Sequence, residues 1–171
     1  MRTTSWPHWP TVATALGAEL ELLGPHGRRV VNAGDFFTGP FATARRPDEL
    51  LVEARLPLLP AGSAVGFAEY RRTHASFAQL AVVAAVIVTG GRVVSASLGL
   101  VNAADRPVRA RAAERALIGR PLGDTGIAAA ARAAAEQDAD PRPGPCADVA
   151  YQRHVVAVLT RRALTEARDG G

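Results

Sequence analysis

His74 has the neighbours that best suit proton-transfer chemistry in this sequence. It lies in the segment RRTHASF, shortly after Glu69 and Tyr70. A histidine close to a carboxylate can accept and return a proton near neutral pH. His74, Glu69 and Tyr70 are therefore the acid/base candidates of an enzyme that would work without a cofactor. The alternative for His74 is a structural role, as an exposed or hydrogen-bonded residue of a loop.

Metal-binding and other familiar catalytic patterns are absent from the sequence. The remaining histidines, His8, His26 and His154, do not have the spacing of HxH or HxxxH motifs. The single cysteine, Cys146, excludes an internal disulfide and a cysteine-based metal cage. The patterns GxGxxG, GxxxxGK[ST] and GxSxG do not occur either. We therefore expect no metal site and no serine hydrolase of the GxSxG type.

The candidate residues would be positioned by antiparallel strands in the first part of the chain. Apolar and polar residues alternate in short runs, which are separated by turns such as GPHG and TGGR. After a short helix that ends before Gly17, we predict strands of one sheet at residues 19–22, 28–31, 50–56, 65–72, 78–88 and 93–101. Glu49, Glu53 and Glu69 belong to this part, where two of them could form a carboxylate pair.

The last third of the chain changes from a period of two residues to one near 3.6, which is typical of helices. The predicted helices are residues 108–118, 124–136 and 148–167. Their apolar stripes would cover one face of the sheet. The sequence thus predicts an α+β fold, with a mainly antiparallel sheet in residues 1–102 and a mainly helical part in residues 103–171.

Composition and charge exclude several classes of function. The formal net charge is +4, but every basic residue is an arginine, and acids are interleaved with them, as in RARAAERALIGR. We therefore expect no nucleic-acid binding. No apolar run reaches the roughly 20 residues of a membrane helix, and the segment MRTTSWPHWP has no apolar signal-peptide core. The expectation is a cytoplasmic protein that does not bind membranes.

Four longer segments carry a specific resemblance to a known family. They are DFFTGPFATARRPDELLVEARLP, FAEYRRTHASFAQLAVVAAV, VNAADRPVRARAAERALIGRPL and YQRHVVAVLTRRAL. The first is similar to the pattern D-F-F-x-G-x-x-x-T-x-x-x-x-x-E-[IL]-L, which precedes a strand ending in proline. All four resemble, in the same order, motifs of the FAD-binding (medium) subunit of the molybdenum hydroxylases, the family of carbon monoxide dehydrogenase and xanthine dehydrogenase.

The resemblance implies an α+β fold and assigns a role to each part of the chain. Residues 1–102 would be the second half of the FAD-binding lobe, and residues 103–171 the small C-terminal domain of the flavoprotein. FAD would be the cofactor, and molybdopterin and iron–sulfur subunits would be the partners. Leu51 and Val52 on the strand, and His74 and Ser76 on the loop, would lie near the isoalloxazine ring. The Phe-Phe loop would be a packing corner between hairpin and sheet.

Two features of that family are missing from the sequence. Glycine-rich loops of the A-G-G-T and A-G-G-S types do not occur, and the similarity begins with the segment that follows the second loop. Backbone amides of such loops bind a pyrophosphate, so weak FAD binding is expected unless an N-terminal flavin-lobe fragment supplies them. In addition, RTHASFA at residues 72–78 replaces R-R-H-G-D-F-A.

Three functions are left open by these observations. The first is a partial flavin subunit, truncated or split, that completes a FAD site for electron transfer from iron–sulfur partners. The second is a free-standing tailoring enzyme for cyclisation or condensation, which reuses the emptied flavin cleft and its acid/base candidates. The third is a non-catalytic scaffold, in which an uncovered sheet face leads to a homo-oligomer.

Overall fold

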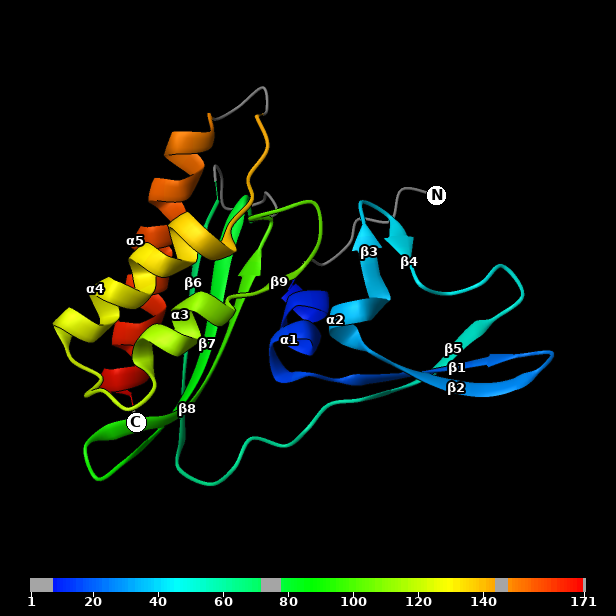
Figure 1. The fold of residues 1–171 in the computed structure, drawn as a ribbon, viewed down its shortest axis with the longest axis horizontal. Helices are drawn as coiled ribbons and strands as arrows, with labels where there is room; N and C mark the ends of the chain where they lie inside the picture. The colour runs from blue at the N-terminus through cyan, green and yellow to red at the C-terminus, as the bar shows by residue number, and fades with distance from the viewer. Residues whose placement is uncertain (1–7, 72–77, 144–147, 171) are drawn as a thin grey trace.

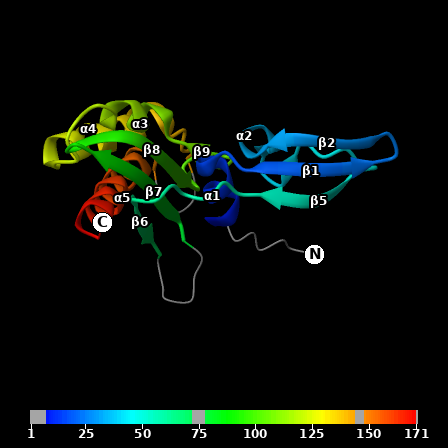
Figure 2. The same cartoon turned by 90° about the horizontal axis from the view of Figure 1, so that it is seen from below.

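The computed structural model describes residues 8–71, 78–143 and 148–170. Their strands form two larger antiparallel sheets and a small two-stranded one. Helix α1 (His8–Leu16) lies between the two larger sheets, as Figures 1 and 2 both show. His74, Ser76 and Cys146 lie outside the described residues.

The first sheet has three strands in the order β2-β1-β5. Its hairpin follows from the alternating ELEL segment and from the turn before Gly27, whose φ of 113° favours glycine. Strand β5 pairs with the other side of β1, and a β-bulge interrupts the register beside Glu21 and Leu22. The bounds are Glu19–Gly24 for β1, Gly27–Asn32 for β2 and Leu50–Arg55 for β5.

The Phe-Phe segment forms a packing corner, which joins the hairpin to helix α1. It contains the short helix α2 and the ribbon β3-β4, where a loop was predicted. Phe36 is buried with Leu20, Leu22 and Ala13 in one cluster, and its ring meets that of Phe37 edge-on at 5.2 Å between centroids. The bounds are Ala33–Phe36 for α2, Phe37–Gly39 for β3 and Ala42–Thr43 for β4.

The second sheet has four antiparallel strands in the order β6-β7-β8-β9. The turn between β7 and β8 contains Gly90 and Gly91, both with positive φ, as the TGGR segment predicts. The long apolar run of the sequence is β7, whose alternate residues Val82, Ala84 and Val86 face the core. The bounds are Ser63–Tyr70 for β6, Leu80–Thr89 for β7, Arg92–Val101 for β8 and Val108–Arg109 for β9.

The helices of the last third cover one face of this second sheet (Figure 1). Leu98 and Leu100 of β8 pack in one buried cluster with Leu117, Ile127 and Leu164 of the helices. The bounds are Arg111–Leu117 for α3, Asp124–Ala133 for α4, Ala134–Asp138 for the π-helical turn η1 and Val149–Asp169 for α5.

The structure confirms the α+β fold and corrects the number of sheets. The predicted strands form two sheets rather than one, and only the second is covered by the C-terminal helices. The first sheet ends where β5 ends, because the connection from β5 to β6 contains prolines at 57 and 60, which cannot donate to a sheet ladder. The predicted boundary between two domains at residue 102 stays a prediction.

Candidate functional site

The two apolar residues predicted to lie near a flavin are exposed on strand β5. Leu51 and Val52 are each 42% exposed, and the preceding Leu50 is 68% exposed. Leu22 lies opposite Leu51 and Glu21 lies opposite Glu53, so Val52 is the extra residue of the β-bulge. Bulges bend a strand and redirect its side chains. Strand β5 therefore presents large apolar side chains to solvent at a bend.

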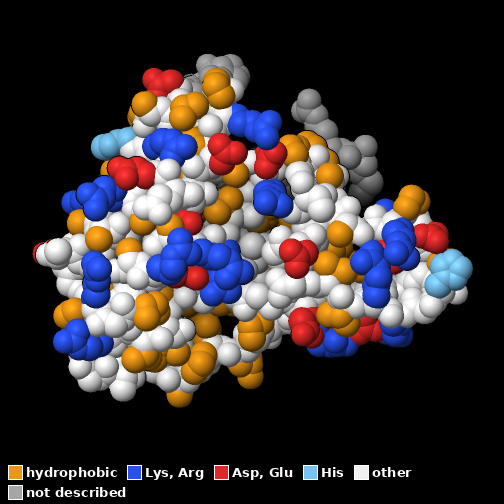
Figure 3. Space-filling view, in the orientation of Figure 1, with side chains coloured by type: hydrophobic (Ala, Val, Ile, Leu, Met, Phe, Trp, Pro, Cys, Tyr) orange, Lys and Arg blue, Asp and Glu red, His pale blue; other side chains and the backbone are white. Residues whose placement is uncertain are grey.

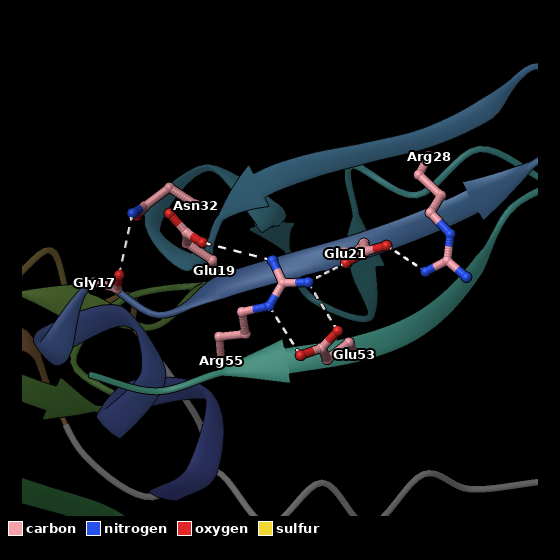
Figure 4. A network of polar contacts seen from close by, with 7 residues as sticks. All are labelled: Gly17, Glu19, Glu21, Arg28, Asn32, Glu53 and Arg55. Atoms are coloured by element: carbon pink, nitrogen blue, oxygen red, sulfur yellow. Dashed lines mark hydrogen bonds and ion pairs between the residues drawn. The ribbon is translucent and has the colours of Figure 1, made fainter. Parts of the chain in front are cut away.

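Beyond the bulge, β5 is fixed to β1 by a network of charged side chains (Figure 4). Arg28 and Arg55 both bind Glu21, whose side chain is largely buried. Arg55 also donates to Glu53, with 2.9 Å between Nε and Oε1. The hydrogen bond from Arg28 holds the pKa of the Glu21 carboxyl below its ordinary value, burial opposes it, and Arg55 reinforces it. The network gives the C-terminal half of β5 a defined position.

The start of β5 is fixed by Glu49, a carboxylate buried beside the hairpin. Arg29 binds it with two hydrogen bonds, at 2.7 Å to Oε1 and 2.8 Å to Oε2. The backbone N–H of Arg46 donates to the same carboxylate at 2.7 Å. These contacts, with Arg29 the larger cause, lower the pKa of Glu49 from 4.5 to about 2. Glu49 is thus an anion at neutral pH, and it anchors the loop before β5.

A second polar cluster surrounds Glu69 near the end of β6. The Nε2 atom of His8, on helix α1, lies 3.5 Å from Oε2 of Glu69. Arg71 lies 2.8 Å from the other carboxylate oxygen. The His8 ring also meets the Phe67 ring edge-on, at 5.5 Å between centroids. Glu69 therefore has Arg71 as its close cationic partner and His8 as a second neighbour, and sequence spacing alone does not predict the contact with His8.

Tyr70 points to the opposite face of the same sheet. It packs against the helical core, and a hydrogen bond with Tyr151 of α5 raises the pKa of Tyr151, with burial adding to the effect. Successive residues of a strand face opposite sides. Glu69 and Tyr70 therefore face opposite sides of β6. The acid/base hypothesis stays a prediction, because His74 lies outside the described residues.

The predicted carboxylate pair is not formed by Glu49, Glu53 and Glu69. Each has its own cationic partner, which is Arg29 for Glu49, Arg55 for Glu53 and Arg71 for Glu69. Glu53 instead shares Arg55 with Glu21, its neighbour across the β1–β5 pair. Sequence spacing could not show this, because the pairing depends on the register of β5 against β1.

A polar groove of about 740 Å³ lies between helices α1 and α2 and the segment after β8. Four aspartates and four arginines line it, namely Asp35, Asp105, Asp138, Asp140, Arg106, Arg109, Arg111 and Arg142. Asp105 pairs with Arg142 at 2.7 Å, and Asp138 accepts hydrogen bonds from the backbone N–H groups of Ala112 and Ala113. The formal charges of these eight side chains therefore balance. The predicted site residues within the described ranges do not line it.

Comparison with protein families matches both parts of the chain. The family described as CO dehydrogenase flavoprotein C-terminal domain matches residues 65–167, which is more than half of the chain. The FAD binding domain in molybdopterin dehydrogenase matches residues 3–59. The chain belongs to the family of the CO dehydrogenase flavoprotein C-terminal domain. The FAD-binding match contains Leu51 and Val52, and the C-terminal match contains Glu69 and Tyr70.

Curated members of this flavoprotein family are similar to nearly the whole chain. The carbon monoxide dehydrogenase medium chain of Afipia carboxidovorans is 33% identical over 93% of this chain and 55% of its own length. The glyceraldehyde dehydrogenase medium chain of Sulfolobus acidocaldarius is 32% identical over 92% of this chain and 55% of its own length. The chain therefore spans about half the length of these relatives.

Solved structures of this flavoprotein family share the fold. A chain of the reconstituted CO dehydrogenase from Oligotropha carboxidovorans has a TM-score of 0.88 and 33% identity, over 95% of this chain and 56% of its own. A chain of quinoline 2-oxidoreductase from Pseudomonas putida 86 has a TM-score of 0.85 and 28% identity, over 94% of this chain and 55% of its own. In the described part of the present chain, no helix is long and apolar enough to cross a membrane.

Proposed function

We propose that this chain is a partial flavin subunit of a molybdenum hydroxylase-type oxidoreductase. In this role it completes a FAD site with an N-terminal flavin-lobe fragment and receives electrons from iron–sulfur and molybdopterin subunits. The observation that carries the proposal is the exposed apolar surface of β5 within the FAD-binding match. A surface of this kind is unusual for a strand that has no further partner.

The residues of β5 suit the isoalloxazine part of FAD. The ring system is flat and largely apolar, and Leu51 and Val52 offer exposed apolar side chains at the bulge. The anchors on either side of them, Glu49 and the Glu21–Arg55 network, keep the strand in place without a ligand. When bound, FAD supplies the redox chemistry, and the protein supplies its position and surroundings.

This sequence contains no loop of the kind that binds the pyrophosphate of FAD. The glycine-rich loops of the family are missing, and the double-glycine turn at Gly90 and Gly91 joins two strands rather than a strand and a helix. Close approach of several backbone amides is what binds a pyrophosphate. The chain alone should therefore hold FAD weakly, and an N-terminal fragment should supply the missing anchor.

Visible absorption spectra after FAD addition and desalting test this proposal. We expect the chain alone to lose its flavin. Together with an N-terminal fragment of the Afipia carboxidovorans medium chain that carries both glycine-rich loops, it should retain flavin. Stable flavin on the chain alone, or none on the reconstituted pair despite association of the two, would contradict the proposal. Reduction of the retained flavin by added molybdenum and iron–sulfur subunits would then test the electron-transfer role.

A matched pair of substitutions separates flavin contact from general damage to the sheet. Leu51→Asp should lower flavin retention in the reconstituted pair by roughly tenfold, because a carboxylate would have to be desolvated against the ring. Val30→Asp changes another exposed apolar residue of the same sheet, 51% exposed on β2, and should leave retention unchanged. Equal losses in both variants would count against Leu51 as a flavin contact.

A further inference from the structure

Strand β5 leaves an unprotected edge, unlike the other long edge strands of the described residues. The edge strand β2 carries two bases, Arg28 and Arg29, and like charges on an edge repel a second copy of the same strand. On the edge strand β6, the backbone N–H of Phe67 donates to the carboxylate of Glu166 at 2.9 Å. Strand β5 instead begins with Leu50, Leu51 and Val52, and nothing in the described part of the chain pairs with its outer edge.

The sequence around β5 is chemically symmetric about Ala54. Residues at equal distances from Ala54 correspond in type. These pairs are Glu53 and Arg55, Val52 and Leu56, and Leu50 and Leu58. The first pair thus joins an acid to a base, and the other two pairs join apolar residues. All four of these apolar residues are exposed, Leu58 at 95%. A strand with this symmetry is complementary to a second copy of itself that runs in the opposite direction.

We propose that two copies of this chain pair through β5 in an antiparallel, two-fold symmetric manner. Ala54 lies at the axis, opposite Ala54 of the second copy. Glu53 then lies opposite Arg55 of the second copy, and Val52 opposite its Leu56. The two three-stranded sheets become one continuous sheet, with both β5 strands at its centre. The ladder extends β5 from Arg55 to Leu56, and Pro57, which lacks an N–H, ends it at each side.

The charges around Arg55 allow this pairing without loss of the contacts within each chain. Arg55 and Glu53 lie on the same face of β5, where they already bind each other (Figure 4). Directly opposite residues of an antiparallel pair share a face. The two copies therefore bring Glu53, Arg55 and their symmetry mates into one ring of alternating charge. Pairing uses the edge of β5, whereas a flavin would lie on a face, so this inference does not rest on the flavin proposal.

Sedimentation analysis of the full chain over a range of micromolar concentrations tests the pairing, without FAD. We expect a species of two 17.9 kDa chains. Glu53→Arg sets two arginines opposite each other at both symmetric positions and should raise the dimer dissociation constant by at least about tenfold. Leu58→Asp, on a fully exposed side chain, should weaken the dimer without affecting the fold. The control Val30→Asp, at the β2 edge, should leave the dimer intact.

Disulfide cross-linking tests the register directly. In a Cys146→Ser background, Ala54→Cys should cross-link to itself, because opposite Cα atoms of an antiparallel pair lie within reach of a disulfide. Val52→Cys and Leu56→Cys should cross-link when mixed, and much less when each is oxidised alone. A chain that stays monomeric throughout the concentration range would overturn the proposal. So would a dimer that resists both Glu53→Arg and Leu58→Asp and shows no Ala54→Cys cross-link.

Discussion

At the scale of single residues, Glu49 shows how a buried charge can hold a loop in place. Its carboxylate is almost fully covered, yet both oxygens are used by Arg29 and one also by the Arg46 N–H. A buried charge is tolerated when its hydrogen-bonding capacity is met in this way. Arg29 reaches further, to the carbonyl of Ala44 at 2.7 Å, so the same guanidinium fixes both ends of the loop.

The lowered pKa of Glu49 makes this anchor sensitive to acid. A carboxyl with a folded-state pKa of about 2 and an ordinary value of 4.5 stabilises the fold above pH 4.5 and loses that contribution as the pH falls towards 2. We expect the free energy of unfolding of the wild-type chain, measured with urea, to fall across this window. Glu49→Gln should be less stable at pH 7 and should fall less between pH 4.5 and 2.

The control for this prediction is Asp48→Asn, which changes the exposed neighbour of Glu49 in the same loop. It should keep the acid dependence of the wild-type chain. If the free energy of unfolding fell equally with pH in the wild-type chain and in Glu49→Gln, Glu49 would not stabilise the folded state in the way proposed.

Residue types alone revealed only part of the site. Leu51 and Val52 were predicted from the family motif around them, because that motif specifies a strand with apolar residues. The partners of the charged residues were not predictable, since His8 meets Glu69 only when α1 packs on the second sheet, and Arg29 of β2 meets Glu49 only when the loop before β5 folds back on the hairpin. These contacts join positions that are at least 20 residues apart in the sequence, so they form only through tertiary packing.

At the scale of elements, the contact between α5 and β6 depends on one glycine. A Cβ atom at Gly66 would lie 1.9 Å from the carbonyl oxygen of Ala163 and 2.9 Å from the backbone N of Ala167. The neighbouring atoms are helix backbone, which cannot rotate away as a side chain could. Helix α5 therefore lies directly on β6 only because residue 66 has no side chain.

Gly66→Ala should destabilise the protein by about 3 kcal/mol, because overpacking at this contact must displace the helix. Thermal or urea unfolding would measure the loss. Gly123→Ala is the matched control, because a Cβ there meets no atom within 4 Å and the φ of −106° is ordinary for alanine. Similar stabilities for the two variants would mean that α5 can shift at little cost.

Most helices and strands were predictable from hydrophobic periodicity and from the glycines and prolines that end them. The arrangement of the strands into sheets was not predictable in this way. The GPHG and TGGR turns, Gly17 and Pro57 mark element ends that the structure confirms within a few residues. Alternation alone could not divide the strands between two sheets, since a strand pattern does not identify its partner. Nor could it predict the bulge at Val52, which arises from the fit of β5 to β1.

At the scale of the whole molecule, the two sheets have separate hydrophobic cores. Leu20 and Leu22 belong to a small cluster with Phe36, whereas the second sheet shares a much larger cluster with the helices. Helix α1 contributes to the small cluster through Ala13 and also packs on β8, where Gly99 allows close approach of Thr11 and Ala15. Because small cores bury less apolar surface, the first sheet should be the less stable unit.

Hydrogen exchange of a core variant tests this division. Leu20 is fully buried, and Leu20→Ala should cost about 3 kcal/mol through lost burial and a cavity. We expect amides of β1, β2 and β5 to exchange faster in this variant, while amides of β7 and β8 keep their protection. Leu98→Ala, in the large cluster, should instead accelerate exchange in both sheets, because α1 loses its support on β8. If Leu20→Ala accelerated exchange equally throughout the chain, the two sheets would unfold as one unit, and strand β5 would owe its position to the whole molecule rather than to its own anchors.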